Sequence, residues 1–491
     1  MINRLCKKLN HSVEVRQSLS SLRQEIKDPD KKELLLSWIQ DGDLNLTAFL
    51  SDDDAKTRKN AALLIGELAL SSCVPALFSA YQKEETLFVR ESYLTAMQSM
   101  DASFYLSALK ERFKELSSYK PVPEEQKHIE KELHALSDLI LSMEPYRKHP
   151  FRSGRQTFHC LLRTNPLYPE ITQQQLSDAK TSVSRLGVQV KTNHLNRLLP
   201  IRTWQELLFQ VPGMTSSKAD PDTIAKTIAK SELLNLLSNT HDGDFPFFFR
   251  IDIKSKMSLS DRSRFAQKTA QALERYTDRK LMNSTSYYEL ELRLIEGKSG
   301  IFYLLTKFHT IKDHRFEYRQ EYIPTSIKPV NAALLVELAK DYMVPDAQIL
   351  DPFCGVGTML IERQKAIKGN TSYGIDHSPE AIEKAIRNTQ NADQIIHYIN
   401  KDCFTFTHQY AFDEIFTEMP YASGKKSEAE IFEVYEKFFP FARKLLTPEG
   451  TIIMYTRNHD YVKKLCTKQN FQMIREFKIS EKPETWLTIL K

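Results

Sequence analysis

Apolar residues recur at helical spacing through the first 145 residues of the chain. The run 54–68 has this pattern and the run 85–97 repeats it, with Arg58 and Arg90 in matching places 32 residues apart. A period of this length is typical of stacked helix pairs, each too small to bury its apolar face alone. We therefore predict an all-helical region over residues 1–145.

The first of these runs follows the pattern Asp-x-x-x-Arg-x-x-Ala-Ala from Asp54 to Ala62, and the second follows it loosely. In this respect the region resembles HEAT repeats. The resemblance implies an α-solenoid whose surface binds a protein partner; a generic helical bundle is the alternative.

The pattern changes after a helix-like run over 124–143 and a turn-prone, basic linker over 144–150. Short apolar runs and amphipathic stretches then alternate irregularly, which predicts an α+β domain over 150–310. We predict strands at 158–164, 245–253, 287–294 and 300–306, and helices at 173–186 and 260–276.

From residue 332 onward, apolar strands alternate regularly with helical patterns. This alternation predicts an α/β fold with a doubly wound parallel sheet, in which ligands bind at the carboxyl ends of the strands. The predicted strands are 348–351, 372–376, 395–400, 414–417 and 451–456.

Composition fits a cytoplasmic, soluble, globular protein. A chain of 491 residues suggests about three or four domains, and it contains no apolar run near the roughly 20 residues that span a bilayer. Residues 1–8 lack the features of a signal peptide. The six cysteines stand far apart without a Cys-x-x-Cys pair, which argues against disulfides and a zinc site and for a reducing cytoplasm.

The positive charge of the chain gathers in its middle. The net charge is +5, and residues 246–328 hold 16 Lys and Arg against 10 Asp and Glu, whereas residues 329–491 hold 20 against 22. Such a surplus is the footprint of a polyanion binder, with ordinary solvated surface as the alternative. The candidate RNA contacts are Arg250, Lys254, Lys256, Arg262 and Arg264.

The run 349–358 predicts a strand, a tight turn and a helix start. Its two glycines permit positive backbone angles and a close ligand approach, and the turn aims helix N–H groups at a polar ligand. The spacing allows a dinucleotide site, an S-adenosylmethionine (SAM) site or a plain tight turn. A nicotinamide site is disfavoured because Leu360 stands where a third glycine would fall.

Polar residues end the next two strands. Asp376 follows Gly357 by 19 residues and is placed to accept both hydroxyls of a ribose; its alternative role is to cap the helix near Pro379. Asp402 ends the third strand, where a carboxylate can accept a hydrogen bond from an adenine amine; its alternative is an exposed loop residue.

The fourth strand ends in Glu418, Met419, Pro420 and Tyr421. Pro420 and Tyr421 suit a rigid wall against a flat base or amide, and Glu418 suits an acceptor for an exocyclic amine that attacks a methyl group. The alternative is a plain strand end.

Together these motifs resemble the class I methyltransferases that methylate the exocyclic N2 of guanine in tRNA or ribosomal RNA. The segment 318–329 looks like the pre-motif segment of that group, and the order of the middle region is similar to its ferredoxin-like and THUMP RNA-binding modules. The resemblance implies a Rossmann-like, SAM-dependent methyltransferase domain over 318–491. It assigns the cofactor loop to Asp351, Pro352, Phe353, Cys354, Gly355, Gly357 and Thr358, the ribose to Asp376, the adenine to Asp402, and catalysis to Glu418, Pro420 and Tyr421.

The chain departs from the group at the fourth strand, where Glu418 replaces Asn or Asp, Met419 replaces Pro or Leu, and Ala422 replaces Gly. The extra methylene of Glu418 moves its acceptor outward by about 1.5 Å. A misplacement of about 1 Å can cost about a hundredfold in rate. The alternatives therefore stay open: methylation of adenine N6 in DNA, methylation of glutamine N5 in proteins, or a non-catalytic SAM-binding scaffold.

Overall fold

A computed structural model describes residues 1–119, 121–144, 148–153, 156–176, 179–184, 186–298, 300–422 and 427–491. The predicted linker therefore lies partly outside the described residues. The chain divides into two compact units. The first holds Met1–His149, Gly243–Ile251 and Ser258–Leu290, and the second holds Pro150–Asp242, Asp252–Met257 and Glu291–Lys491.

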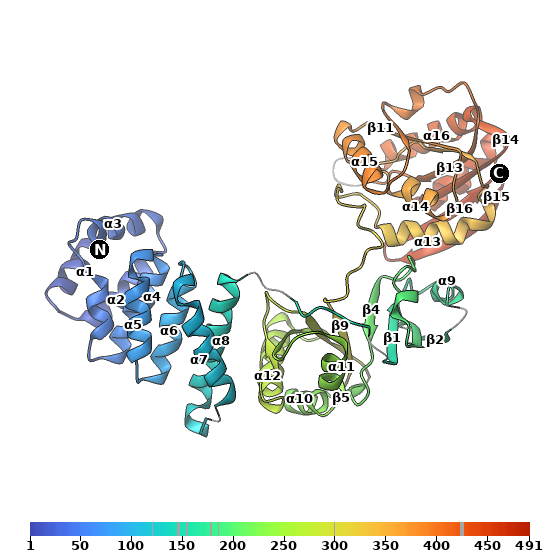
Figure 1. Cartoon of the computed structure of the whole chain (residues 1–491). Coiled ribbons are helices and arrows are strands. Elements are labelled where there is room, and N and C mark those ends of the chain that lie inside the picture. The colour runs from blue at the N-terminus through green and yellow to red at the C-terminus, as the bar shows by residue number, and fades with distance from the viewer. Residues whose placement is uncertain are drawn as a thin grey trace. The chain divides into compact units, whose positions relative to one another are not determined.

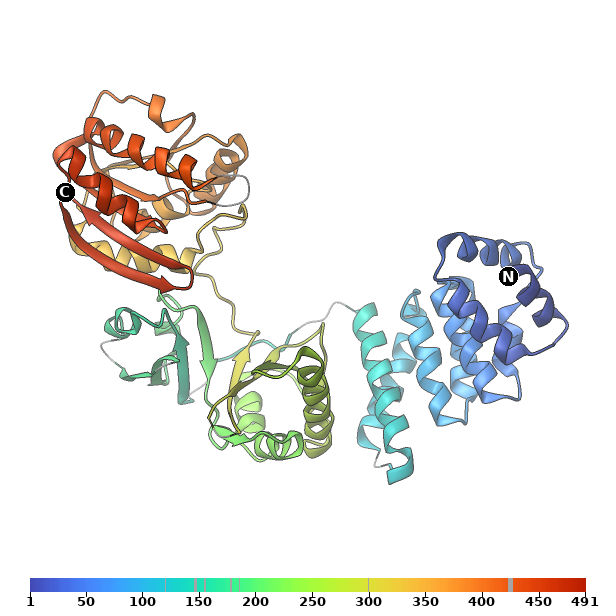
Figure 2. The same ribbon diagram turned by 180° about the vertical axis from the view of Figure 1, so that it is seen from behind.

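The N-terminal region is helical, as its periodicity predicts, and Figures 1 and 2 show its helices stacked side by side. Their inward faces form one apolar core. The helices are α1 (Ile2–Asn10), α2 (Val15–Glu25), α3 (Pro29–Gln40), α4 (Ala55–Glu67), α5 (Val74–Lys83), α6 (Leu87–Met97), α7 (Leu106–Ser118) and α8 (Pro123–Met143).

The repeated polar positions of this region have structural roles. Asp54 caps α4 by accepting from the backbone N–H groups of Lys56 and Thr57. Arg58 binds both oxygens of the buried Glu84 carboxylate at 2.8 and 2.7 Å, and Arg90 donates to the backbone oxygen of Glu84 at 2.8 Å. The two arginines that match in sequence therefore meet the same residue between α5 and α6.

The middle region combines a mainly antiparallel sheet with three short helices and the longer α12 (Leu259–Tyr276) among its described residues. In the second unit the strands pair in the order β2-β3-β1-β4-β9-β8, and β5 also pairs with β9. The strands are β1 (Phe158–Arg163), β2 (Lys180–Ser184), β3 (Gly187–Thr192), β4 (Glu206–Phe209), β5 (Ser216–Lys218), β6 (Phe247–Lys254), β7 (Leu281–Asn283), β8 (Leu290–Glu296) and β9 (Ile301–Phe308). The helices are α9 (Pro169–Gln174), α10 (Pro221–Ala229), α11 (Leu233–Thr240) and α12 (Leu259–Tyr276).

The predicted strands β1, β6, β8 and β9 and the predicted helix α12 are present, but the helix predicted over 173–186 is wrong. The chain forms the short helix α9 and then strand β2; residues 177, 178 and 185 lie outside the described part. Strand β2 pairs antiparallel with β3 from Lys180 opposite Lys191 to Ser184 opposite Gly187. Its β-branched Thr181 and Val183 favour a strand, and this pairing outweighs a weak helical pattern.

The C-terminal sheet has the order β12-β11-β10-β13-β14-β16-β15. The five predicted strands pair in parallel, and two strands that were not predicted, β15 and β16, complete the sheet in antiparallel pairing. The strands are β10 (Gln348–Asp351), β11 (Thr371–Asp376), β12 (His397–Asn400), β13 (Phe412–Glu418), β14 (Leu446–Thr456), β15 (Met473–Glu481) and β16 (Glu484–Leu490). The helices are α13 (Pro329–Ala339), α14 (Thr358–Ala366), α15 (Pro379–Asn391), α16 (Glu428–Leu445) and α17 (His459–Leu465).

Helices cover both faces of this sheet. On one face α16 and α17 pack on Leu350, Ile415 and Ile452, and on the other α13, α14 and α15 pack on Ile349, Phe416 and Ile453. Neighbouring strand residues thus face opposite cores, as the period of two requires. This three-layer arrangement leaves the carboxyl ends of the parallel strands open for a ligand.

Three further observations concern the described residues alone. None of their helices combines the length and apolar character needed to cross a membrane. No group of three His, Cys, Asp or Glu side chains among them is arranged to hold a metal ion. All six cysteines are free, and Cys73 alone among them is not buried.

Candidate functional site

A cavity of about 730 Å³ opens at the carboxyl ends of β10, β11, β12 and β13. The loops that leave these four strands form most of its wall, and the segment before α13 closes one side. The lining residues are Ile323, Thr325, Ser326, Ile327, Pro352, Phe353, Cys354, Gly355, Val356, Thr358, Met359, Asp376, His377, Ser378, Lys401, Asp402, Cys403, Phe404, Glu418, Met419, Pro420, Tyr421 and Val434.

The two glycines of the first loop have different roles. Gly355 lines the cavity with φ +53°, and a side-chain carbon placed on it would meet no atom within 4 Å. Gly357 precedes α14 with φ +81° and lies outside the lining. A side-chain carbon there would lie 2.2 Å from the hydroxyl of Tyr398. Gly355 therefore permits close approach of a ligand, whereas Gly357 permits close packing of the fold.

Asp376 ties the second strand to this loop. Its carboxylate accepts from the backbone N–H of Gly355 at 3.0 Å and from that of Ser378 at 2.9 Å. The alternative role predicted for Asp376 belongs to Ser378, whose hydroxyl caps α15. Asp376 is thus held in place at the cavity wall, with lone pairs left for a ligand's hydroxyl groups.

Asp402 and two aromatic rings form the neighbouring part of the wall. Asp402 is exposed and accepts from the backbone N–H of Phe404 at 3.1 Å, which starts the short helix η6 (Cys403–Thr405). The rings of Phe353 and Phe404 meet edge to face with centroids 6.3 Å apart. The wall here offers apolar ring surface beside a carboxylate, a combination that suits a flat, amine-bearing base.

Asp351 lies beneath the cavity and does not line it. One carboxyl oxygen accepts from the Thr417 hydroxyl at 2.6 Å and from the Phe353 N–H at 3.1 Å, and the other is buried without a partner among the described residues. Burial raises the pKa of Asp351 to about 7, against the lowering effect of these two hydrogen bonds. Asp351 therefore joins the first loop to β13 from below.

Glu418 ends β13 and opens into the cavity beside Pro420 and Tyr421. Burial and the nearby Asp351 raise the pKa of Glu418 to about 7, while Arg457 opposes the shift. Among the described residues, no hydrogen bond or ion pair engages its carboxyl group. A carboxyl group that is free and titrates near neutrality suits proton transfer.

The segment before α13 is fixed to the cofactor loop by two polar side chains. Arg319 donates to the Thr358 hydroxyl at 3.1 Å. The buried Asn388 of α15 accepts from the Glu321 N–H at 3.0 Å and donates to the backbone oxygens of Glu321 at 3.0 Å and Val356 at 3.2 Å. The predicted pre-motif segment therefore reaches the cavity as a well-supported wall.

The cavity brings together most of the predicted site residues. Asp351 and Gly357 support the loop from outside the lining. Lys401, His377 and Phe404 line the cavity without having been predicted, and Arg457 contacts Tyr421 at its edge. Arg457 follows the fifth parallel strand directly, so extending the strand-end rule to that strand would have found it. The predicted residues in the lining are Pro352, Phe353, Cys354, Gly355, Thr358, Asp376, Asp402, Glu418, Pro420 and Tyr421.

The five candidate RNA contacts differ in the unit they belong to, in their exposure and in their partners. Arg250, Arg262 and Arg264 belong to the first compact unit, and Lys254 and Lys256 to the second. Arg250 stacks on the Tyr288 ring at 4.2 Å, Arg264 lies 3.8 Å from the Asp261 carboxylate, and Lys254 lies 3.1 Å from that of Asp252. Lys256 is exposed and Arg262 is half-buried.

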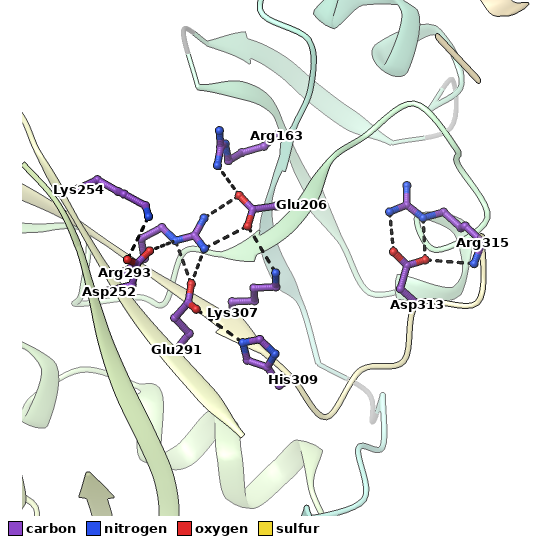
Figure 3. A network of polar contacts seen from close by, with 10 residues as sticks. All are labelled: Arg163, Glu206, Asp252, Lys254, Glu291, Arg293, Lys307, His309, Asp313 and Arg315. Carbon is purple, nitrogen blue, oxygen red and sulfur yellow. Dashed lines mark hydrogen bonds and ion pairs between the residues drawn. The ribbon is translucent and has the colours of Figure 1, made fainter. Parts of the chain in front are cut away.

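Part of the positive charge in the middle region is neutralised internally, as Figure 3 shows. Arg293 is nearly buried and pairs with Glu206 at 2.7 Å, with Asp252 at 3.2 Å and with Glu291. Burial alone would raise the pKa of Glu206, but Arg293 and its neighbouring cations hold that pKa at about 2. Asp252 and Glu291 are already part of the charge count for residues 246–328. Glu206 lies outside that count, so its carboxylate offsets part of the positive surplus.

The cavity has the features that a nucleoside ligand needs. Open space above Gly355, a fixed carboxylate at Asp376 and an aromatic wall at Phe353 and Phe404 fit the ribose and base of SAM. The unpartnered buried oxygen of Asp351 beneath the same loop provides a further polar group near the site.

Comparison with known proteins identifies the C-terminal domain. Residues 317–484 match the family model described as "RMKL-like, methyltransferase domain". No curated protein matches the chain.

Solved structures share the fold of more than this domain. TrmN from Thermus thermophilus is 16% identical with a TM-score of 0.50, over 68% of this chain and 99% of that one. SMU.472 complexed with SAH is 14% identical with a TM-score of 0.54, over 68% and 98%. A protein of Listeria monocytogenes described as a predicted N6-adenine-specific DNA methylase is 16% identical with a TM-score of 0.54, over 69% and 97%.

The family match, the order of the parallel strands and the position of the cavity all indicate the same kind of domain. The similarity to solved structures covers about two thirds of the chain and so extends beyond the C-terminal third that matches the family model. The C-terminal domain of this chain is a methyltransferase domain, and SAM is the methyl donor whose ribose and base its cavity fits.

Proposed function

We propose that the chain methylates the exocyclic N2 of guanine in RNA, with tRNA as the first candidate substrate. The observation that carries this proposal is the free carboxyl group of Glu418, which opens into the same cavity as Asp376 and Asp402. A nucleotide base that reaches the Glu418 side would face a cofactor held at the Asp376 side.

Bound SAM supplies an electrophilic methyl carbon. The amine nitrogen of the base forms a bond to that carbon as the bond from carbon to sulfur breaks, and the amine then gives up one proton. Glu418 accepts the hydrogen bond of the amine and takes its proton, for which a pKa of about 7 is well matched. Pro420 and Tyr421 hold the base in line with the methyl group.

The carboxylate favours guanine over adenine. An ionised carboxylate only accepts hydrogen bonds, and guanine offers two adjacent donors, its N1–H and its N2 amine. Adenine pairs its N6 amine with an acceptor, N1, which an amide side chain satisfies better. The replacement of Asn or Asp by Glu418 is therefore compatible with a guanine substrate.

RNA is favoured by the organisation of the chain. The order of the elements in the middle region, 150–310, is similar to that of a ferredoxin-like segment with a THUMP module. The surplus of Lys and Arg over 246–328 favours a polyanion as the partner of this region. We propose that this region binds RNA through exposed cations such as Lys256 and Arg264. We further propose that the HEAT-like stack of residues 1–145 binds a protein partner, and that the protein acts in the cytoplasm.

Methyl transfer from tritiated SAM into RNA, DNA and protein tests the proposal. We expect label in RNA, and mass analysis of its nucleosides should identify N2-methylguanosine. Label in adenine of DNA or in glutamine of protein would contradict the proposal. If no substrate accepts label and Glu418→Asn gains activity, the natural protein is a SAM-binding scaffold and the proposal is wrong.

A further inference from the structure

Arg457 lies at the edge of the cavity next to the catalytic candidates. It follows β14, whose register with β13 places Glu418 opposite Tyr455, and Arg457 comes two residues after Tyr455. Its guanidinium carbon lies 3.6 Å from the centroid of the Tyr421 ring. This distance is well within the range of a cation–π contact.

The guanidinium of Arg457 has donors to spare. The side chain is exposed, and within the described part of the chain no ion pair or hydrogen bond engages it. Stacking on Tyr421 uses the flat face of the group and leaves its N–H edges free. By contrast, the nearly buried Arg293 and the buried Arg363 are bound to carboxylates.

Arg457 also acts on Glu418 through its charge. It lowers the pKa of Glu418, whereas Asp351 raises it. Burial is the main cause that raises the pKa of Tyr435 of α16 and of Tyr455 of β14, and the Glu418 carboxylate adds to the rise of each. The charge of Arg457 thus opposes the unfavourable effect of burial on the ionised form of Glu418.

We infer that Arg457 is a substrate-positioning residue: it stacks on Tyr421 to fix that ring and binds a backbone phosphate of the nucleotide whose base occupies the cavity. The inference rests on the proposed function, because the nucleic-acid substrate supplies the backbone phosphate. A flat guanidinium that stacks on one face and offers donors at its edge is well suited to phosphate recognition.

Two substitutions at position 457 separate charge from stacking. Arg457→Gln removes both, and we expect it to raise KM for RNA at least about tenfold while the Kd for SAM stays unchanged. The salt dependence of RNA affinity should become less steep by about 0.7 in the log–log slope, as for the loss of one phosphate contact on a single strand. Arg457→Lys keeps the charge, so it should keep the salt slope of the wild type. It should still raise KM, but by less than Arg457→Gln does, because it loses the flat guanidinium.

The matched control is Arg475→Gln. Arg475 is another exposed arginine of the same domain, stacked on Phe477 at 5.3 Å and outside the cavity lining. It should leave KM, kcat and the salt slope as in the wild type, and thermal unfolding should show that all variants are folded.

The pH profile adds a readout that a merely structural role would not move. Without the cation, the apparent pKa that governs kcat should rise in Arg457→Gln, because Glu418 loses the charge that favours its ionised form. If Arg457→Gln keeps the KM, the salt slope and the pH profile of an RNA-active wild type, the inference is overturned and the proposed function stands. If the wild type transfers no methyl group to RNA, the proposed function is contradicted and this inference falls with it.

Discussion

Glu414 and Glu418 lie on the same face of one strand, β13, but in different surroundings. Glu414 is buried in the sheet, and Arg363 binds both of its oxygens at 2.9 Å. Glu418 reaches the cavity at the strand end, where nothing among the described residues binds its carboxyl group. Burial raises the pKa of both groups, but only Glu414 has a cation bound to it.

The comparison teaches that burial and a shifted pKa do not by themselves identify a reactive group. A buried carboxylate whose oxygens are all engaged serves the fold, and a carboxyl group left free at a cavity serves chemistry. Substitution by Gln should therefore lower the rate of methyl transfer at Glu418 and the stability of the fold at Glu414.

The largest effect is expected at Glu418. Glu418→Gln keeps the shape of the side chain but cannot take a proton, so kcat should fall by about 10²- to 10⁴-fold. Single-turnover methyl transfer measures the loss, and unchanged thermal unfolding and SAM binding are the controls. Full methyl-transfer activity of Glu418→Gln would contradict a role for the Glu418 carboxyl group in the reaction.

Glu414→Gln should lower stability instead. It leaves the buried Arg363 without its carboxylate, which costs about 3–5 kcal/mol of unfolding free energy. Denaturant unfolding measures this loss. In the matched control Glu433→Gln, which breaks an exposed helical pair with Lys437, the change should be far smaller. Equal losses of unfolding free energy in Glu414→Gln and Glu433→Gln would show that the buried pair of Arg363 and Glu414 stabilises the fold no more than an exposed pair does.

The two glycines of the cofactor loop sharpen the comparison between fold and function. Gly357→Ala places a carbon against Tyr398, so it should lose about 1–3 kcal/mol from overpacking in addition to about 1–2 kcal/mol from its left-handed backbone. Gly355→Ala meets no atom and should lose only the backbone part. Thermal unfolding measures the loss of stability in both variants. A larger loss in Gly355→Ala than in Gly357→Ala would contradict the assignment of Gly357 to packing and of Gly355 to ligand approach.

Asp376→Ala should weaken cofactor binding and leave the fold intact. It removes the acceptor for the ribose and frees the Gly355 loop, so the Kd for SAM should rise about tenfold or more, a loss of about 1.4 kcal/mol or more. Isothermal titration measures the change, with the exposed Asp460→Ala of α17 as the control. Unchanged affinity would mean that Asp376 does not hold the cofactor.

The fold of the C-terminal domain follows from its sequence because most of its parallel strands are short, buried, mainly apolar runs. The five predicted strands are those of the parallel part of the sheet. The strands β15 and β16 were not predicted, and β15 exposes polar residues such as Arg475 and Glu476, which interrupt its apolar pattern. The edge strand β2 was mistaken for a helix for a similar reason.

The residues of the site could be predicted where a motif marks a strand end, as at Gly355, Asp376 and Glu418. Their hydrogen-bond partners could not, because these come from distant segments: Thr417 binds Asp351, and Asn388 binds the backbone of Glu321. For the same reason the pairing of Arg293 with Glu206 and Asp252 was invisible in the charge count.

The most direct test of the account is the pH dependence of single-turnover methyl transfer to RNA, from about pH 5 to about pH 9. The reaction needs the ionised form of Glu418, whose pKa is raised to about 7. The rate should therefore rise about tenfold per pH unit below that value and level off above it, and the residual rate of Glu418→Gln should lack this step. A wild-type rate that is flat across the range, or the same step in Glu418→Gln, would contradict the assignment of Glu418 as the group that takes the proton.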